Sequence, residues 1–479
     1  MSTLFQSGQT IINIGLASFA DSISQAGGKV VQLDWTPPAG GDRVAGWSLA
    51  NLVGQPEVER ANEVAYARYL SAQPALLGVA TAREALPGLG ERMILHAGPP
   101  IEWDEMCGPM QGAVIGAILL ERWAADPSAA RELASSGTIR FEPAHHHAAV
   151  GPMAGIISPT MPVWIVENTS AGNRAFSNMN EGLGKALRFG ANGPEVIQRL
   201  RWMSEIMAPA LQATLRTVGP IQLKPLIAQA LQMGDEVHNR NAAASSLFLK
   251  KVVSAALRSG FDRSAIAETL TFIANNDHFF LNLSMAACKA MLDAAHDVAN
   301  SSMVTAMSRN GVRFGVRLSG TGSQWFEAEA PAVNGLYFPS YGPEHAAPDM
   351  GDSSITETAG LGGFAMATAP AIVQFVGGTP QDAIANTREM TYITLGRNSA
   401  FTLPAMNFSG TPAGIDARKV LDTGIAPIIN TGIAHREAGV GQIGAGITRA
   451  PLECFSQAVV ALASSVGTST DESDSRRGA

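Results

Sequence analysis

Hydrophobic and polar positions change their spacing along the chain, and each spacing predicts a different set of elements. Residues 10–36 hold two apolar, β-branched runs, TIINIGL and KVVQLDW, on either side of SFADSISQA, whose polar and apolar residues alternate at helical spacing. This order predicts a strand, a helix and a second strand. The Pro/Gly-rich TPPAGGD predicts a linker, and the Ala-rich residues 47–92 are expected to be mostly helical.

The spacing of apolar and polar residues changes twice more along the chain. From 93 to 192, short apolar runs end in Gly, Pro and polar loops, which indicates strands alternating with short helices in an α/β layer. Residues 194–300 carry apolar stripes at helical spacing, beginning with Leu200, Met203 and Met207, and predict about four helices. Strands return at 301–350, where Asn-Gly between two β-type runs predicts a hairpin.

Together these patterns predict an α+β fold in which α/β-type layers carry an inserted helical subdomain. The expected divisions are a strand–helix–strand docking segment (1–45), an N-terminal α/β domain (46–192), a helical subdomain (193–300), a C-terminal α/β domain (301–466) and a disordered tail (467–479). The longest uncharged run, 359–381, is interrupted by Gly, Thr and Pro, so we interpret it as buried core rather than a membrane span.

Composition narrows the function classes. The 479 residues are 46% hydrophobic and 15% charged, which excludes global disorder. A net charge of −8 without a Lys/Arg block argues against nucleic acid or an anionic membrane as a partner. Three scattered cysteines rule out a disulfide framework and fit a reducing compartment, and no signal sequence opens the chain, so a cytoplasmic protein is expected.

Histidines mark two of the polar loops that follow apolar strands. His96, in LHAGPP, is a candidate for polarising a carbonyl or holding a phosphate, with a hydrogen bond to the loop backbone as the alternative. The triplet His145, His146 and His147 suggests metal binding, contact with an anion or carbonyl, or a structural role. Adjacent side chains on a strand point to opposite faces, so at most two of the three share one ion.

The densest polar segment is VENTSAGNRAFSNMNEGLGKALRFG, residues 166–190. It leads through Asn173, Arg174 and Asn180 into a predicted helix that bears Lys185 and Arg188. Helix starts attract anions and Arg grips carboxylates or phosphates, so we predict an anion site here. A solvated, charged helix start is the alternative.

Two later loops combine glycines with acids or histidine. PDMGDSSITETAGLGG holds Asp349, Asp352 and Glu357, which suit a divalent cation, the orientation of a base, or the capping of a helix. INTGIAHREAGVGQIGAG places His435 beside Gly441 and Gly444. Its G-x-G-x-x-G spacing is not followed by a βαβ unit, so it predicts a phosphate or carboxylate loop rather than a dinucleotide site.

A further polar string, MGDEVHNRN at 233–241, ends an apolar helix. Glu236 and Arg240 are spaced to support that helix, while His238 and Asn241 are candidates for facing the crevice. We favour a structural role for this string. The sequence contains no phosphate-binding P-loop, no serine nucleophile elbow and no dithiol motif.

These strings, together with FFLNLSMAACKA and VTAMSRNGVRFGVRLSG, resemble those of the YlbE-like proteins over roughly residues 90–465. The resemblance implies an α+β fold with a helical insert, and a place in the oxamate carbamoyltransferase system of anaerobic allantoin breakdown. There the family is one of several subunits, alongside an FdrA-like protein related to succinyl-CoA synthetases. The family pattern has two histidines, matching His145 and His146, so His147 is an extra residue; Asn239 stands where glutamine is commoner.

We therefore expect a subunit that interconverts oxamate, or a similar small amide, and carbamoyl phosphate with the N-carbamoyl product and phosphate. Its expected partners are these small molecules and an FdrA-like subunit, in a homo- or hetero-oligomer. No particular cofactor is predicted, and a divalent metal is left open. The expected catalytic residues are His96, His145, His146 and Arg174, and the expected binding residues are Asn173, Asn180, Lys185, Arg188, Asp349, Asp352, Glu357, His435, Gly441 and Gly444.

Two alternatives stay open. One is a metal-assisted amide hydrolase that uses His145, His146, Asp349 and Asp352. The other is a non-catalytic scaffold that completes the site of an FdrA-like partner.

Overall fold

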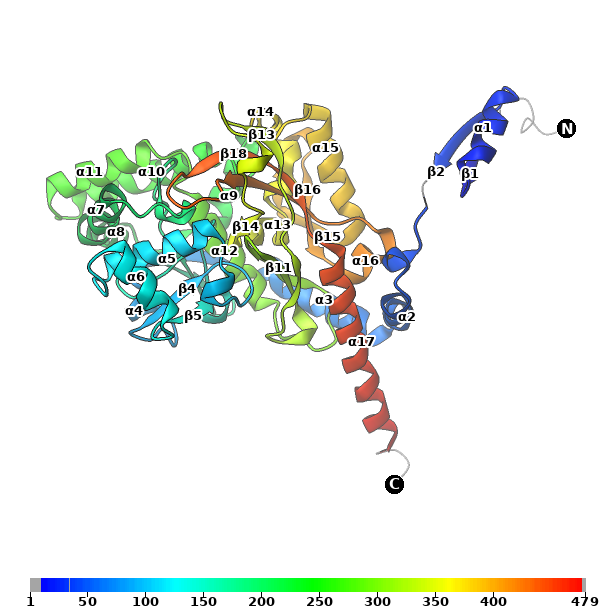
Figure 1. Ribbon diagram of the computed structural model, residues 1–479, viewed down its shortest axis with the longest axis horizontal. Helices are drawn as coiled ribbons and strands as arrows, with labels where there is room; N and C mark the ends of the chain where they lie inside the picture. Colours follow the sequence, from blue (N-terminus) through cyan, green and yellow to red (C-terminus); the bar gives the residue numbers. More distant parts are fainter. Residues whose placement is uncertain (1–9, 34, 476–479) are drawn as a thin grey trace.

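The computed structural model describes residues 10–33 and 35–475. The predicted strand–helix–strand unit is confirmed as β1 (Thr10–Ile14), α1 (Ala17–Gln25) and β2 (Lys29–Leu33), with β1 and β2 paired in parallel. Figure 1 shows this unit standing apart from the body of the molecule. Several of its large apolar side chains are exposed, among them Ile12, Leu16 and Phe19.

The body begins with α2 (Arg43–Leu52) and α3 (Pro56–Ser71), as predicted for residues 47–92, but the next segment is a strand, not a helix. This strand, β3 (Pro74–Thr81), is largely buried and lies inside a five-stranded sheet of order β6-β8-β7-β3-β9. A strand that is covered on both faces shows an apolar run without alternation, so its period cannot be distinguished from that of a buried helix. The other members are β6 (Ala149–Val150), β7 (Pro162–Asn168), β8 (Arg174–Asn178) and β9 (Ile221–Gln222).

A smaller parallel pair lies beside this sheet. It joins β4 (Met93–His96) to β5 (Arg140–Pro143), and between them the chain forms α5 (Gly108–Leu120) and α6 (Pro127–Ser135). The loop after β4 and the short 3₁₀ turn after β5 (Ala144–His147) carry the first two histidine motifs to the centre of the molecule.

Residues 194–300 are helical, as predicted, and pack against the five-stranded sheet. The helices are α7 (Pro194–Trp202), α8 (Ala208–Val218), α9 (Leu223–Gln232), α10 (Ala242–Arg258), α11 (Arg263–Ala274) and α12 (Leu281–Ala294), with a π-helical turn between α7 and α8. Helix α8 contacts β3, and α12 contacts β7 and β8. Every side chain of residues 281–292 is buried, so α12 is a central element of the core.

The predicted hairpin is confirmed as β10 (Val304–Asn310) and β11 (Arg313–Leu318). It belongs to a four-stranded sheet of order β12-β11-β10-β14, with β12 (Phe326–Glu329) and β14 (Met350–Gly351). The remaining strands form the sheet β13-β18-β17 and the pair β15-β16; they are β13 (Asn334–Tyr337), β15 (Thr394–Leu403), β16 (Ser409–Ile415), β17 (Ile428–Ala434) and β18 (Gln442–Arg449). These later sheets are antiparallel, and the α+β class is confirmed.

Short helices connect these sheets, and a long one ends the described chain. They are α13 (Ile355–Thr358), α14 (Val373–Val376), α15 (Pro380–Glu389), α16 (Ala417–Thr423) and α17 (Leu452–Ser475). The sequence predicts disorder from residue 467, whereas α17 continues to Ser475, because a helix held by packing near its start propagates at little cost per residue. Residues 476–479 of the expected tail lie outside the described part.

One continuous core joins the N-terminal sheet, the helices and parts of the C-terminal half, with members from Ala65 to Ala434. Residues 359–369 are buried, as expected for most of that uncharged run. Among the described residues, no helix is long and apolar enough to cross a membrane. The three cysteines are free, as predicted.

Candidate active site

Residues 349–358 form a fully buried polar turn at the centre of the molecule. The turn begins where β14 pairs with the end of β10. Gly351 has φ 114°, and a Cβ at this position would lie 2.5 Å from the backbone nitrogen of Met153, so only glycine fits. The hydroxyls of the turn are satisfied locally: Ser354 Oγ donates to Met307 O at 2.6 Å and Thr358 Oγ1 donates to Ser354 O at 2.9 Å.

Asp352 gathers three other segments around the turn. Its Oδ1 accepts hydrogen bonds from Ser308 Oγ and from the Gly98 amide at 3.0 Å, and its Oδ2 accepts from the Gly151 amide at 2.9 Å. Burial raises the pKa of this carboxyl to about 6, although these hydrogen bonds lower it. A carboxyl with this pKa exchanges a proton close to neutral pH.

His145 faces Asp352, with its Nε2 lying 3.5 Å from Oδ1. Its ring is buried, and neither ring nitrogen has a hydrogen-bond partner within the described chain. Burial lowers the pKa of His145 well below its usual value, and the nearby Lys289 and Arg317 lower it further. The imidazole is therefore neutral, and its two nitrogens are available to a substrate.

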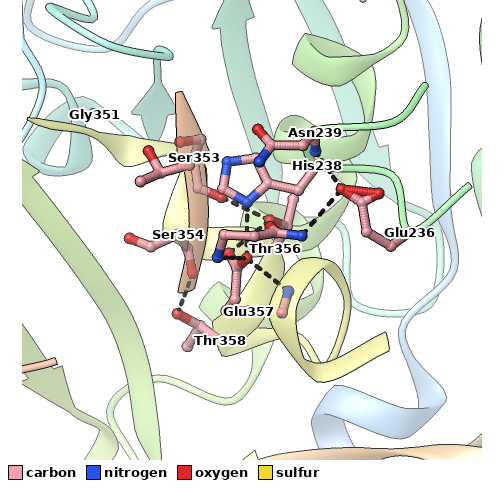
Figure 2. A network of polar contacts seen from close by, with 12 residues as sticks. Glu236, His238, Asn239, Gly351, Ser353, Ser354, Thr356, Glu357 and Thr358 are labelled. Atoms are coloured by element: carbon pink, nitrogen blue, oxygen red, sulfur yellow. Dashed lines mark hydrogen bonds and ion pairs between the residues drawn. The ribbon is translucent and has the colours of Figure 1, made fainter. Parts of the chain in front are cut away.

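A second histidine–carboxylate pair lies at the other end of the turn (Figure 2). His238 Nδ1 donates to Glu357 Oε1 at 2.8 Å, and both side chains are buried. Glu357 also accepts from the Gly363 amide at 2.8 Å and from Thr356 Oγ1 at 2.9 Å. A carboxylate that holds Nδ1–H fixes the tautomer in which Nε2 is free to accept a proton.

Glu236 closes this second cluster. Its carboxylate accepts from the amides of Asn239 and Arg240 and from Asn430 Nδ2, and Figure 2 shows it beside the His238 loop. Burial raises the pKa of Glu236 to about 7. The amide oxygen of Asn430 and the amide nitrogen of Asn239 have no partner among the residues that the structure describes.

The family model for oxamate carbamoyltransferase subunit AllG matches residues 139–353. Oxamate carbamoyltransferase subunit AllG of Escherichia coli is 48% identical over 413 residues, which cover 86% of this chain and 99% of that protein. The chain belongs to the AllG family.

Two further relatives extend the comparison. The uncharacterized protein YahG of E. coli is 46% identical over 461 residues, covering 96% of this chain and 98% of its own length. A crystal structure of a conserved protein of unknown function from Enterococcus faecalis has a TM-score of 0.84 at 47% identity, covering 85% of this chain and 98% of that one. The expected kinship with an oxamate carbamoyltransferase subunit is confirmed, although none of these relatives carries the YlbE-like name.

In this AllG-family chain, the other predicted histidines lie near the same centre. His96 is fully buried, its Nδ1 bonds Ala97 O at 2.8 Å, and its Nε2 is without a partner in the described residues. Burial lowers its pKa to about 4. His146 is exposed and accepts from Trp325 Nε1 at 3.0 Å. His147 is structural, because it bonds Pro87 O and Glu142.

Arg174 and Lys185, by contrast, lie apart from the turn. Arg174 is on β8, not in a loop, and its exposed guanidinium pairs with Glu167 at 2.8 Å. Lys185 is exposed and precedes a short 3₁₀ turn, Leu187–Phe189, where the sequence predicts a helix. Asn173 closes the β7–β8 turn by bonding Asn168 and Ala290 O.

The predicted anion site at Arg188 is occupied by the chain itself. The carboxylate of Glu181 accepts from the Leu187 amide at 2.7 Å and the Arg188 amide at 3.1 Å. Burial lowers the pKa of Arg188 to about 10, and Arg188 donates to Gly182 O. Asn180 is buried, with its Nδ2 donating to Asn282 Oδ1 at 3.0 Å.

The glycine loop of residues 435–444 packs against the Lys185 segment. A Cβ on Gly441 would lie 2.9 Å from Gly184 O, so the two loops touch. His435 Nδ1 accepts from the Glu437 amide, and its ring stacks on His345. Gly444 is inside β18, opposite Ile433.

Asp349 has a structural partner. Arg309 donates to it from Nε at 2.6 Å and from Nη2 at 2.9 Å, and both side chains are completely buried. Among the described residues, no three His, Cys, Asp or Glu side chains are placed to hold a metal ion. His145, His146, Asp349 and Asp352 therefore do not form the metal set of the hydrolase alternative.

Sequence reasoning missed four residues that surround His145: Lys289, His296, Arg317 and Trp325. Trp325 lies edge-on to His145 with ring centroids 5.4 Å apart, and Arg317 stacks over Trp325 at 5.6 Å. One signal was present, since Lys289 is the only charged residue in the apolar run FFLNLSMAACKAML. A lysine on an otherwise apolar helix is buried with its neighbours, and a buried lysine is rare unless it has a partner.

The larger surface clefts lie elsewhere. One of about 410 Å³ is lined by Tyr66, Asp416 and Arg418, and another of about 950 Å³ by Trp123 and Arg201. Burial of unpartnered polar atoms, rather than cleft size, therefore identifies the candidate site.

Proposed function

We propose that this chain is a subunit of an oxamate carbamoyltransferase and that the turn at 349–358 carries the proton transfers of the reaction. The kinship with AllG supports the enzyme class. The observation that carries the proposal is the presence of two buried histidine–carboxylate pairs, His145 with Asp352 and His238 with Glu357, on one ten-residue turn. Such pairs move protons at defined atoms.

The reaction requires a proton to travel between oxygen and nitrogen. When N-carbamoyl oxamate reacts with phosphate, a phosphate oxygen forms a bond to the carbamoyl carbon and the bond from that carbon to the amide nitrogen breaks. The proton lost by hydrogen phosphate ends on the nitrogen of oxamate, which makes oxamate a competent leaving group. The products are carbamoyl phosphate and oxamate, and the reverse reaction moves the same proton back.

The two pairs suit the two ends of this transfer. Neutral His145 offers one nitrogen as an acceptor and the other as a donor, and Asp352 has a pKa of about 6. His238, held by Glu357 through Nδ1, presents Nε2. General acid–base catalysis by positioned side chains contributes about 10²–10⁴-fold to a rate.

The N-terminal unit supports the assignment to a complex. β1, α1 and β2 form a parallel pair covered by one helix, and Ile12, Ile14 and Phe19 remain exposed. A two-stranded parallel sheet is marginal alone, and exposed apolar patches mark interaction sites. We propose that this unit docks onto the FdrA-like partner subunit, so a chain beginning at Pro38 should keep its thermal midpoint but fail to co-purify with the partner.

The test is formation of carbamoyl phosphate from oxalurate, which is N-carbamoyl oxamate, and phosphate by the assembled complex. Asp352→Asn and His145→Asn should each lower kcat at least about 100-fold. His147→Asn, from the same triplet, is the matched control and should keep the wild-type kcat in whatever fraction folds. Full turnover by both test variants would reject the site and leave the chain a scaffold.

A further inference from the structure

Two buried cations, Lys289 and Arg317, lie near His145, and the carboxylates of Asp293, Asp297 and Asp352 act on them. Lys289 is 2% exposed and Arg317 is 8% exposed. Lys289 Nζ pairs with Asp293 at 2.6 Å, but Arg317 makes no ion pair with any described carboxylate. Burial lowers the pKa of both groups, so the folded protein bears a cost for keeping them charged. The charge of Arg317 lowers the pKa of Lys289 further, whereas the carboxylates of Asp293 and Asp297 raise the pKa of Arg317.

Arg317 is held in place by groups that carry no negative charge. Its Nη2 donates to His296 Nε2 at 2.9 Å, and the other nitrogen of His296 lies 2.9 Å from Thr305 Oγ1. Because His296 accepts this bond it is neutral, and burial together with Arg317 lowers its pKa to about 4. The Nε of Arg317 is buried with no partner within residues 10–33 and 35–475. The guanidinium is therefore oriented without a direct carboxylate contact, although Asp293 and Asp297 lie close enough to raise its pKa.

Backbone amides in this centre are already used by internal carboxylates. Asp352 takes the amides of Gly98 and Gly151, Glu357 takes that of Gly363, and Glu236 takes that of Arg240. An incoming anion thus finds side-chain donors rather than amides. The unused donors are the Nε of Arg317 and the single N–H of neutral His145, and Lys289 acts on His145 from nearby.

We propose that Arg317, Lys289 and His145 form a binding site for a phosphate-type oxyanion, entered past the exposed His146 and the half-buried Trp325. This inference rests on the proposed function, for which it supplies the subsite of the phosphoryl group. Arg317 and Lys289 bring two positive charges to the two negative charges of hydrogen phosphate, and Asp293 already pairs with Lys289. The donors come from a helix, a strand and a turn, and such non-coplanar donors suit a tetrahedral anion better than a planar carboxylate.

Equilibrium dialysis of the full chain against radiolabelled inorganic phosphate tests the site. The wild-type chain should bind one phosphate per chain saturably, with carbamoyl phosphate competing and oxamate not competing. Arg317→Met and Lys289→Met should each raise the Kd at least about tenfold, because each loses a charged donor. Absence of saturable binding by the wild-type chain, or displacement of phosphate by oxamate, would overturn the proposal.

Arg313→Met is the matched control, because Arg313 is on the same strand with its guanidinium in an exposed ion pair to Glu105. The Arg313→Met variant also removes one positive charge, and its Kd for phosphate should stay within about twofold of the wild-type value. If Arg317→Met fails to fold, Arg317→Lys serves as the second variant. It keeps the positive charge but loses the planar set of guanidinium N–H donors, so it should still weaken phosphate binding. An unchanged Kd for Arg317→Lys together with an unchanged Kd for Lys289→Met would overturn the site.

The two proposals fail separately. Phosphate binding that depends on Arg317, in a complex that forms no carbamoyl phosphate, would reject the proposed function and keep the site. Turnover with an unchanged KM for phosphate in Arg317→Met would reject the site and keep the function.

Discussion

Two buried arginines on one hairpin have opposite surroundings. Arg309, on β10, donates to both oxygens of Asp349, to Gly351 O and to Thr431 Oγ1. Arg317, on β11, donates to a neutral imidazole and at 3.5 Å to Gly322 O, and its Nε has no partner in the described chain. Both residues are buried arginines on adjacent strands of the same sheet. They differ in whether a carboxylate contacts the guanidinium.

The contrast separates a structural charge from an available one. Arg309 and Asp349 hold β10, β14 and β17 together, and removing one partner would leave the other charge buried and uncompensated. Arg317 has no such partner to leave behind. A buried cation that the fold orients without a direct carboxylate contact is best explained by a ligand.

The largest effect should come from breaking the paired arginine. Arg309→Met should lower the free energy of unfolding by about 3–5 kcal/mol, because Asp349 would lose its counter-ion in a dry site. Arg317→Met should change it by no more than about 1 kcal/mol, because no carboxylate is orphaned. Urea unfolding followed by circular dichroism measures both, and equal losses in the two variants would contradict the distinction.

A smaller effect should follow from Glu236, whose carboxylate is satisfied by amides rather than by a cation. Its pKa is about 7 when folded, above its usual value, so the folded state keeps this proton to a higher pH than the unfolded chain. Its stabilising contribution is present below the unfolded pKa and is lost as pH rises toward 7. The stability of Glu236→Gln relative to wild type should thus increase by up to about 3 kcal/mol between pH 4.5 and pH 7.5.

Unfolding of both proteins at these two pH values tests this point. Glu57→Gln, at an exposed helical ion pair, is the control and should show almost no such pH dependence. A pH-independent difference for Glu236→Gln would mean that the carboxyl is ionised throughout.

The smallest effect is expected for Arg174, the arginine that the sequence analysis predicted to be catalytic. Arg174→Ala removes an exposed ion pair to Glu167 and should cost no more than about 1 kcal/mol. It should leave the Kd for phosphate unchanged, since Arg174 lies apart from His145 and Arg317. A clear loss of phosphate affinity in this variant would restore the catalytic role that the sequence predicted.

Sequence patterns located several loops of the candidate site before any coordinates. His96 ends strand β4, His145 and Asp352 follow the ends of β5 and β14, and these strand ends meet at this centre. The same patterns assigned Arg174 to a loop, although it continues β8 with its side chain outward, and they interpreted β3 as helix. Local spacing cannot show which face of a strand is covered, because that depends on residues far along the chain.

The amino-acid sequence by itself determined the family, the α+β class, the strand–helix–strand unit and the histidine-bearing loops, because these follow from periodicity and from motifs of adjacent residues. Only the tertiary structure decided which charges are paired. Asp352 meets Gly98 across 254 positions and Arg309 meets Asp349 across 40. Counter-ions come from distant segments, so the unpaired state of Arg317 becomes visible only when every neighbour is in place.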